Sequence, residues 1–524
     1  MTNNARNPTK QVFEMSLLDR AIAFISPQWA FERACYRAGL GYKAGGQSAS
    51  RANWMPISGT GESINQMSRP LMRARARDAE RNSDITNGIL LAYRRNVVGK
   101  GFTLQATSFD EDFNLEAEKV WRRWCKAKNC DITGKQSLRE ILNMLVERTI
   151  VDGGLILVKT VVKGERYPFK IQLREVDDLD TSGFDTPKNG NTVVGGVEID
   201  SNGKPVAYYF KKTAPDGYTN DEVERVPAER VIFYWERKRP TEYREVPRLA
   251  RSLTRIKAMD DFLETTSFAR KISACFALVI TQKFPDGLAS GIGRPIQSLM
   301  EKLTQPQDPT TKVQGFSGGD VLYLQPGQEP HNVVPAGSAN DTKDYLNMQA
   351  RMTAAGQGLS LESANRDVSE VNYSSARQNL LEDKKIYLDM QMSIIEHVLE
   401  PLYEEVIKTA YLTGEIKKRN DFYNRLEDYL ECSFLPQGIP GIDPLKEANA
   451  KKIMLECGLA TYKTLYAEEG KDWREEGKQR ALEKAYFEEI GLETTKKGEG
   501  TNGEPKADKG TGGDGTKNES GNAD

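Results

Sequence analysis

The chain of 524 residues contains little of the chemistry on which most enzymes depend. It has two histidines: His331 in a Pro/Gly-rich stretch, and His397 inside an apolar helical pattern, where we expect it to be packed. Its six cysteines are scattered, so a zinc site made of Cys and His ligands is not expected. The sequence motifs of serine hydrolases, zinc proteases, dinucleotide-binding folds and P-loops are absent. We therefore expect no catalytic residue, no metal and no cofactor, although the many carboxylates leave a metal-dependent nuclease open.

The chain also lacks an excess of either charge and any long hydrophobic run. Lys and Arg total 73 against 75 Asp and Glu, a net charge of -2. This balance excludes a general polyanion binder, whose affinity needs an excess of cationic contacts, but not a protein that guides nucleic acid without gripping it. With no signal peptide and no membrane-spanning run, we expect synthesis and work in a cytoplasm, without a membrane partner. The length predicts two or more domains.

What the sequence does contain is organised around residues 340–412. Residues 341–355 predict a short helix, and Gly356 and Gly358 interrupt the helical pattern because glycine is unfavourable inside helices. The polar segment 359–372 is rich in residues that favour turns. A second, longer helix follows from Tyr373, with a wide apolar face and an expected kink at Pro401. This pattern fits either a core helix of an all-α domain after a disordered connection, or a ring subunit whose loop faces a central space.

Residues 70–97 predict a helix whose first half carries Arg73, Arg75, Arg77 and Arg81, expected to form a solvated face or, alternatively, ion pairs between subunits. A β-rich region follows. Its predicted strands are 155–162, 170–173, 193–200, 206–211 and 231–235. Residues 201–204, with Asn-Gly at the centre, predict a hairpin turn. We interpret the acidic cluster at 175–180 as a surface loop after a strand rather than a cation site.

The remaining segments are interpreted from the same kinds of sequence pattern. Residues 16–39 predict an amphipathic helix that packs on its own body or serves as an arm, and 41–69 a weakly patterned connection. Residues 245–277 predict a helix, and 278–339 short strands and turns inserted before the helix at 341. Helices are expected again over 443–492. The nearly apolar-free tail from 493 is expected to be disordered.

Five segments in this order resemble those of the portal proteins of tailed bacteriophages, in the lambda-like branch. They are RARARDAERNSDITNGILLAYRRNVVGKGF, GGVEIDSNGKPVAYYF, RPTEYREVPRLA, VNYSSARQNLLED and GIDPLKEANAKKIMLECGLATYKTLYAEEGKDW. Together they span about residues 70 to 490. Glu245 stands where the family pattern has glycine.

The resemblance implies an α+β, portal-type fold with long stem and wing helices, a mixed α/β wing and a small β-containing clip. The implied parts are a partly mobile N-terminal arm (1–69), the wing (70–245), a stem helix (246–277), the clip (278–340), a second stem helix (341–356), the tunnel loop (357–372), a long wing helix (373–414), a crown-side helical region (415–492) and a disordered tail (493–524).

The resemblance also implies a function: a ring at one capsid vertex, usually a dodecamer, through which double-stranded DNA is packaged and ejected. Implied partners are further copies of the chain, DNA bound without sequence preference, the major capsid protein, the terminase motor and the head–tail connector. The expected location is the virion, after assembly in the host cytoplasm.

Two sets of residues are expected near the DNA. The basic channel candidates are Arg248, Arg251, Arg255, Lys343 and Arg351, some of which could instead pair with acidic neighbours across subunits. The tunnel-loop candidates are Gln357, Gly358, Glu362, Asn365, Arg366, Asp367 and Glu370. Two other classes stay open: a nucleic-acid-processing enzyme with a carboxylate metal site, and a capsid or scaffolding protein without a DNA channel.

Overall fold

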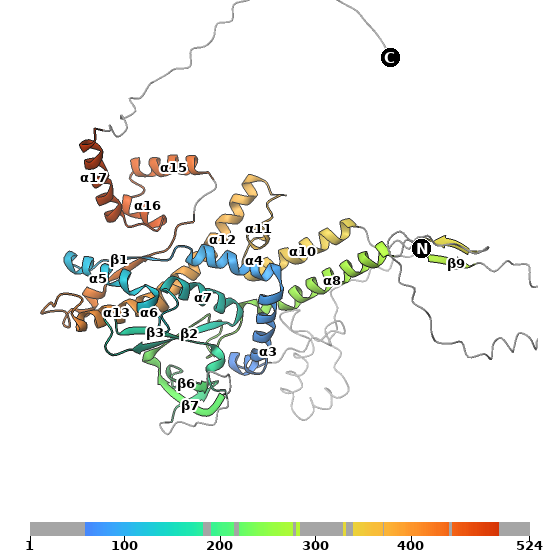
Figure 1. Cartoon of the computed structure of the whole chain (residues 1–524), viewed down its shortest axis with the longest axis horizontal. Coiled ribbons are helices and arrows are strands. Elements are labelled where there is room, and N and C mark those ends of the chain that lie inside the picture. The colour runs from blue at the N-terminus through green and yellow to red at the C-terminus, as the bar shows by residue number, and fades with distance from the viewer. Residues whose placement is uncertain are drawn as a thin grey trace, which may run out of the picture.

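The computed structural model describes residues 58–181, 190–213, 219–275, 279–282, 328–331, 339–369, 371–439 and 443–491 (Figure 1). Helices and several small sheets give the α+β fold that was predicted. The expectations for residues 1–57, for most of the clip and for the tail from 493 lie outside the described residues. None of the described helices is long and apolar enough to cross a membrane.

The first described helices differ from the single helix predicted over 70–97. Helix α3 (Gly61–Asn82) begins nine residues earlier, because Thr60 caps it by accepting a hydrogen bond from the Ser63 amide. Pro70 therefore lies inside α3 rather than at its start. Ser83 is extended and separates α3 from α4 (Asp84–Tyr93), which continues into the π-helical turn η3 (Arg94–Val98). The prediction is thus wrong at the helix start and at Ser83, and residues 61–69 belong to a helix.

The region that we predict as the wing, and call so below, is centred on an antiparallel sheet in the order β3-β2-β8. Its strands are β2 (Gly154–Val161), β3 (Phe169–Arg174) and β8 (Val231–Trp235). Side chains of β2 alternate between two apolar clusters, as the two-residue period of a strand requires. Leu155 and Leu157 join the larger cluster, and Ile156 and Val158 join the smaller one. The larger cluster includes α5 (Glu111–Trp124) and α7 (Leu138–Val151); the short helix α6 (Ala127–Cys130) lies between them in the chain.

The smaller cluster also includes side chains of a four-stranded antiparallel sheet in the order β4-β5-β6-β7. Its strands are β4 (Thr192–Val194), β5 (Val197–Ile199), β6 (Pro205–Thr213) and β7 (Thr219–Pro227). The single strand predicted over 193–200 is wrong, because Gly195 and Gly196 both take positive φ and turn the chain between β4 and β5. The predicted turn over 201–204 is confirmed: the Asp200 amide bonds the Lys204 carbonyl, and Gly203 has φ of 80°.

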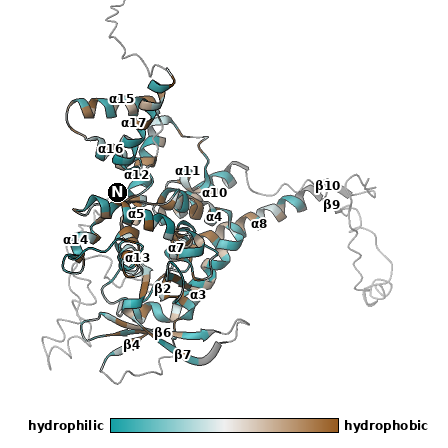
Figure 2. Ribbon diagram, turned by 60° about the vertical axis from the view of Figure 1, so that its left-hand side comes forward, coloured by the Kyte–Doolittle hydropathy of each residue, from teal (hydrophilic) through white to brown (hydrophobic). Residues whose placement is uncertain are grey.

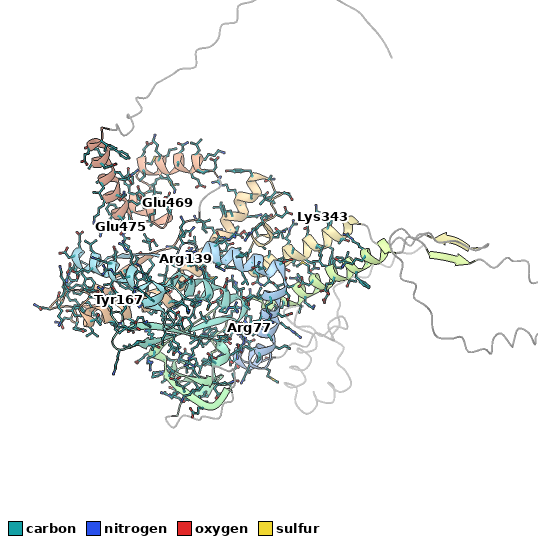
Figure 3. The ribbon with its side chains drawn as sticks, in the orientation of Figure 1. Arg77, Arg139, Tyr167, Lys343, Glu469 and Glu475 are labelled. Atoms are coloured by element: carbon teal, nitrogen blue, oxygen red, sulfur yellow. The ribbon has the colours of Figure 1, made fainter. Side chains whose placement is uncertain are left out.

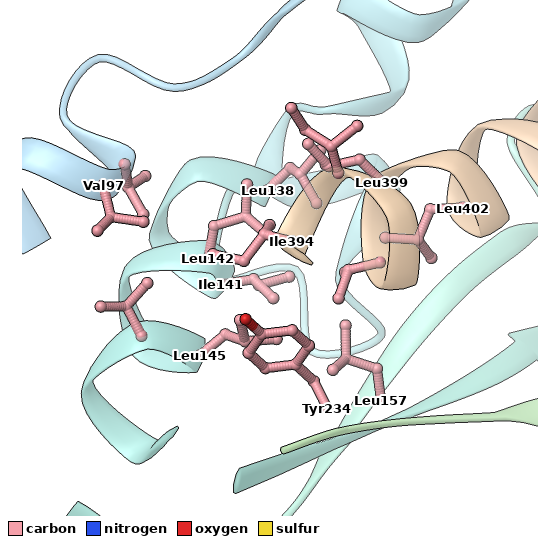
Figure 4. Packing of buried hydrophobic residues seen from close by; sticks show 14 of the residues in the cluster. Val97, Leu138, Ile141, Leu142, Leu145, Leu157, Tyr234, Ile394, Leu399 and Leu402 are labelled. Carbon is pink, nitrogen blue, oxygen red and sulfur yellow. The ribbon is translucent and has the colours of Figure 1, made fainter. Parts of the chain in front are cut away.

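The long helix runs through the larger core as α12 (Tyr373–Ile394), the π-turn η7 (Ile395–Leu399) and α13 (Glu400–Thr413). The sequence predicts a kink at Pro401. The structure has the π-turn directly before this proline, where the Glu400 amide bonds the Ile395 carbonyl one residue further back than in an α-helix. Ile394, Leu399 and Leu402 pack against α7 and β2 (Figure 4). His397, which was expected to be packed, is exposed, so that prediction is wrong.

Two helices project from this body. The 3-10 turn η6 (Arg248–Arg251) leads into α8 (Leu253–Cys275), and α10 (Ala339–Gln357) returns beside it (Figure 1). The rings of Phe262 and Tyr345 contact each other across the pair, tilted by 51° with 4.7 Å between their centroids. At their far end β9 (Val279–Gln282) pairs antiparallel with β10 (Gln328–His331), the described part of the predicted clip.

The first part of the chain after α13 joins the larger core through Ile416, Phe422, Tyr429 and Phe434. Strand β11 (Cys432–Leu435), which follows the short helix α14 (Leu426–Leu430), pairs with β1 (Thr103–Ala106). Helices α15 (Pro444–Glu456), α16 (Tyr462–Glu468) and α17 (Trp473–Glu489) follow and contain no buried residue. The side chains of Gln105 and Arg122 bond those of Asp472 and Glu475, holding this group against the wing.

Candidate functional site: the base of the stem

The site lies where α8 and α10, which we predict to form the stem and call so below, join the body. It begins with a buried polar layer. The Gln357 side chain donates to the Ser252 hydroxyl at 2.9 Å, and Ser252 donates in turn to the Thr353 carbonyl at 3.4 Å. The Tyr93 hydroxyl donates to the Gln357 carbonyl at 2.6 Å, and its burial raises the pKa of that phenol well above its usual range. Gly356 allows the two helices to approach here, because a Cβ on it would lie 2.6 Å from the Ser252 hydroxyl oxygen.

Arg248, the first basic channel candidate, is bound within its own chain. Its guanidinium pairs with Glu236 at 2.6 Å and lies over the Tyr93 ring at 5.0 Å from the centroid. It also donates to the Gln357 carbonyl at 3.5 Å. Arg248 therefore stabilises the junction of η6 with the tunnel-loop segment, and a contact with DNA would compete with these interactions.

The other four basic candidates lie along the stem. Arg251 and Arg351 are exposed, whereas Arg255 is half-buried and donates to the Met352 carbonyl at 3.4 Å. Lys343 is exposed on α10 (Figure 3). With the hydrogen bonds from Ser369, the positive charge of Lys343 lowers the pKa of Asp367, a residue of the tunnel loop. Three of the five candidates thus present their charge at the surface of the stem.

The segment that we predict as the tunnel loop (357–372), and call so below, is more ordered than its turn-rich sequence suggests. Its first half contains α11 (Leu361–Asn365), capped by Ser360, whose hydroxyl accepts from the Ser363 amide. Gln357 is buried, and Gly358 has φ of 77° at the end of α10. Glu362 is half-buried and accepts from the Asn379 side chain at 3.0 Å. The prediction of one continuous polar loop is therefore wrong for residues 357–365, which pack against the body.

The second half of the tunnel loop is exposed. Arg366 ends α11 with φ of 62°, the one positive φ of a residue other than glycine in the described chain. Asn365 accepts from the Asp367 amide, and Asp367 accepts from the Ser369 amide and hydroxyl. These bonds from Ser369, with the charge of Lys343, hold the pKa of Asp367 below its usual range. Glu370 lies outside the described residues.

The arginine run of α3 forms a network that was not expected from sequence. Arg73 pairs with Asp177, and Arg77 pairs with Asp152 at 2.6 Å and Asp177 at 2.7 Å. The predicted solvated face is wrong for Arg73 and Arg77, although Arg75 and Arg81 are exposed as expected. Figure 3 marks Arg77 on α3. The acidic cluster after β3 is thus largely neutralised by arginines, and the spacing of four between Arg69, Arg73 and Arg77 was the signal for one shared helix face.

Glu245 is the centre of this network rather than an ordinary replacement for glycine. Its side chain is fully buried, with one carboxylate oxygen 2.9 Å from Arg73 and the other 2.8 Å from Arg244. Arg69 donates to the Glu245 backbone carbonyl at 2.8 Å and pairs with Glu62. The carboxylate therefore connects α3 to the segment that leads into the stem.

The described part of the chain offers no cluster of metal ligands. Among those residues, no group of three or more His, Cys, Asp or Glu side chains is placed to hold an ion. The pKa of the Cys130 thiol is raised to about 12 by burial, so it is protonated at neutral pH.

Known proteins resemble the chain along most of its length. The probable portal protein of Halomonas phage phiHAP-1 is 24% identical over 446 residues, covering 82% of this chain and 83% of that protein. Portal protein B of Escherichia phage lambda is 23% identical over 469 residues, with 83% and 87% covered.

Solved structures from the necks of gene transfer agent particles also align. One, from empty particles, has 14% identity and a TM-score of 0.39, covering 74% of this chain and 90% of that chain. A second, from native particles, has 13% identity and a TM-score of 0.39, with 78% and 92% covered. The family model described as phage portal protein, lambda family, matches residues 47–391, more than half of the chain. The chain therefore belongs to the lambda family of phage portal proteins.

Proposed function

We propose that copies of this portal protein close into a ring, a dodecamer, and that double-stranded DNA enters and leaves the capsid along its axis. This proposal rests on the stem, because a single chain leaves the apolar side chains of the stem uncovered. Among the described residues of α8 after Met259, and of α10 before Thr353, no side chain is buried. Large apolar side chains nevertheless project there, namely Leu263, Phe268, Met348 and Met352. Neighbouring subunits related by rotation would cover them through repeated contacts between two different faces.

The DNA would pass the exposed charges at the stem and its base. We assign this role to Arg251, Lys343 and Arg351, together with the exposed tunnel-loop residues 366–369. Each tightly neutralised phosphate would retard a sliding duplex, so a few scattered cations beside Asp367 suit passage better than a continuous basic surface. The overall charge of -2 agrees with such weak steering.

The remaining parts supply contacts with other virion components. We assign the wing to the major capsid protein, and the clip at the end of the stem to the terminase during packaging and to the head–tail connector afterwards. In this account the protein has no catalytic activity of its own. It is assembled in the host cytoplasm and stays in the virion at the portal vertex.

Replacing residues 366–371 by a Gly/Ser stretch of equal length tests the channel role, because it leaves the packed half of the tunnel loop in place. Rings and heads should form, while the amount of DNA packaged or retained per head should fall. The matched control is the same replacement in the exposed turn at 201–204 of the wing. Normal DNA content with the 366–371 replacement would refute the assignment.

A further inference from the structure

Helix α11 is tied to the body by a carboxylate from another helix. Asp383 lies on α12 and is almost completely buried, with 3% of the residue exposed. One of its oxygens accepts from the Ser360 amide at 2.8 Å, and the other accepts from the Ser360 hydroxyl at 2.7 Å and from the Ser363 hydroxyl. All three donors are neutral and belong to the first turn of α11 or its cap. Within the described chain, Asp383 forms no ion pair.

A buried carboxylate that is stabilised only by hydrogen bonds depends on each of these bonds to offset its loss of contact with water. Removing such partners leaves a desolvated charge, which is far costlier than losing an exposed bond. The three bonds also require α11 to lie in one place, since donors on Ser360 and Ser363 must reach the same carboxylate. Asp383 is therefore suited to fixing the position of α11.

Packing against α4 leaves α11 little room. Ala364 is buried against α4, where a Cβ on Gly88 would lie 1.9 Å from the Ala364 carbonyl oxygen. Two residues with positive φ, Gly358 and Arg366, bracket the helix. In a non-glycine residue this conformation is strained, so Arg366 is held there by its surroundings. Helix α11 is therefore a rigid segment between two sharp bends of the backbone.

Fixing α11 limits how far the tunnel loop can extend. Seven peptide steps join Asn365 to Asn372, so with both ends held the chain can protrude at most about 12 Å, half its extended length. If α11 came free, fourteen steps from Gly358 to Asn372 would allow about 24 Å. The state of α11 thus changes the reach of the loop about twofold.

We propose that Asp383 is a positioning residue: by holding Ser360 and Ser363 it keeps α11 on the body and confines movement toward DNA to the chain after Asn365. This inference rests on the proposed function for its role in the channel. The attachment itself can be tested without DNA.

The test is hydrogen–deuterium exchange on purified protein carrying Asp383→Ala or Asp383→Asn. The backbone amides of 359–366 should exchange at least about tenfold faster in Asp383→Ala. Asp383→Asn should fall between, because Asn can still accept from the Ser360 amide but its NH2 group cannot accept from the hydroxyls. The control is Glu382→Gln, the exposed neighbour that pairs with Lys385, and β2 is the internal reference.

Unchanged exchange over 359–366 in Asp383→Ala would overturn the proposal. So would equal acceleration in β2, because Asp383 would then stabilise the whole fold rather than α11. If Asp383→Ala yields no folded protein, Ser363→Ala, which removes one donor, decides by the same two criteria.

Phage heads assembled with Asp383→Ala separate this inference from the proposed function. Faster exchange with altered DNA retention supports both. Faster exchange with normal retention keeps the attachment and refutes the tunnel-loop role. Unchanged exchange refutes the attachment, whatever the heads contain.

Discussion

The wing and the stem of this portal protein are stabilised in different ways. The wing buries aromatic and aliphatic side chains from many elements around one large core, whereas the stem helices bury side chains only near the body. Figure 2 shows α8 projecting away from that body. Past Met259, α8 carries Leu263 and Phe268 with 44% and 65% of each residue exposed. The difference agrees with our proposal that one chain folds the wing while other copies complete the stem.

The C-terminal helices resemble the stem in this respect. Helices α15–α17 contain no buried residue, and large apolar side chains are exposed on them, as at Leu482, and between them, as at Leu459. The comparison therefore separates changes that unfold a single chain from changes that act on assembly. The following predictions test that separation, from the largest expected effect to the smallest.

Trp124→Ala should have the largest effect on a single chain. The indole is 1% exposed, stacks on Phe169 and donates to the Phe169 carbonyl at 2.8 Å. Its loss should lower the free energy of unfolding by about 3–5 kcal/mol, measured by urea denaturation followed by circular dichroism. Trp473→Ala, at a half-exposed indole on α17, is the control and should cost clearly less. Equal losses would contradict the comparison.

Glu245→Gln should come next, because it breaks the buried network between wing and stem. Arg73 and Arg244 would lose the carboxylate between them, and breaking a buried pair costs about 3–5 kcal/mol, at the lower end here since Gln can still accept. The same denaturation experiment measures it. Glu222→Gln, which breaks the exposed pair with Lys212, should leave the midpoint unchanged. An unchanged free energy of unfolding in Glu245→Gln would show that the network is not needed for the fold.

Phe268→Ser should act on assembly and spare the single chain. Burying this side chain in a subunit interface contributes roughly 1.5–3 kcal/mol, so ring formation should weaken at least about tenfold at each contact. The free energy of unfolding of the monomer should change by less than about 0.5 kcal/mol. Native mass spectrometry reports the assembly, and Val161→Ser, equally exposed on the wing, is the control. If both variants assemble alike, the stem is not a subunit interface.

The smallest effect concerns pH. Burial raises the pKa of Glu118, and the negative charges of Asp472 and Glu475 raise it further, while bonding by the Ala106 amide lowers it. A carboxyl whose pKa is higher in the folded state stabilises the protein less as pH rises through and above the usual Glu range. Glu118→Gln should remove this part of the decline in Tm with pH. The same slope in both proteins would show that Glu118 does not titrate as proposed.

The sequence was informative wherever the signal is local. The strand β2, the Asn-Gly turn at 201–204 and the helices α8 and α10 were predicted from short patterns and are present in the structure. Two bounds were wrong: α8 begins at Leu253 rather than at 245, and α10 continues through Gly356, where a break was predicted. Such features depend on neighbours a few residues apart, which periodicity and turn chemistry describe directly.

What could not be predicted depends on distant partners. Strand β11 was missed because four residues gain their structure only by pairing with β1, over 300 positions earlier. The roles of Glu245 and Asp383 likewise depend on arginines and serines that the fold brings to them. Arg248 has the sequence context of a DNA contact, but Glu236 and Tyr93 occupy its guanidinium.

A three-dimensional reconstruction of the purified protein by electron cryo-microscopy tests the central claim most directly. The account predicts a closed ring with an open axis, in which α8, α10 and residues 366–369 line the hole and the wing lies at the rim. A protein that stays monomeric under assembly conditions, or a ring with 366–369 on its outer surface, would contradict it.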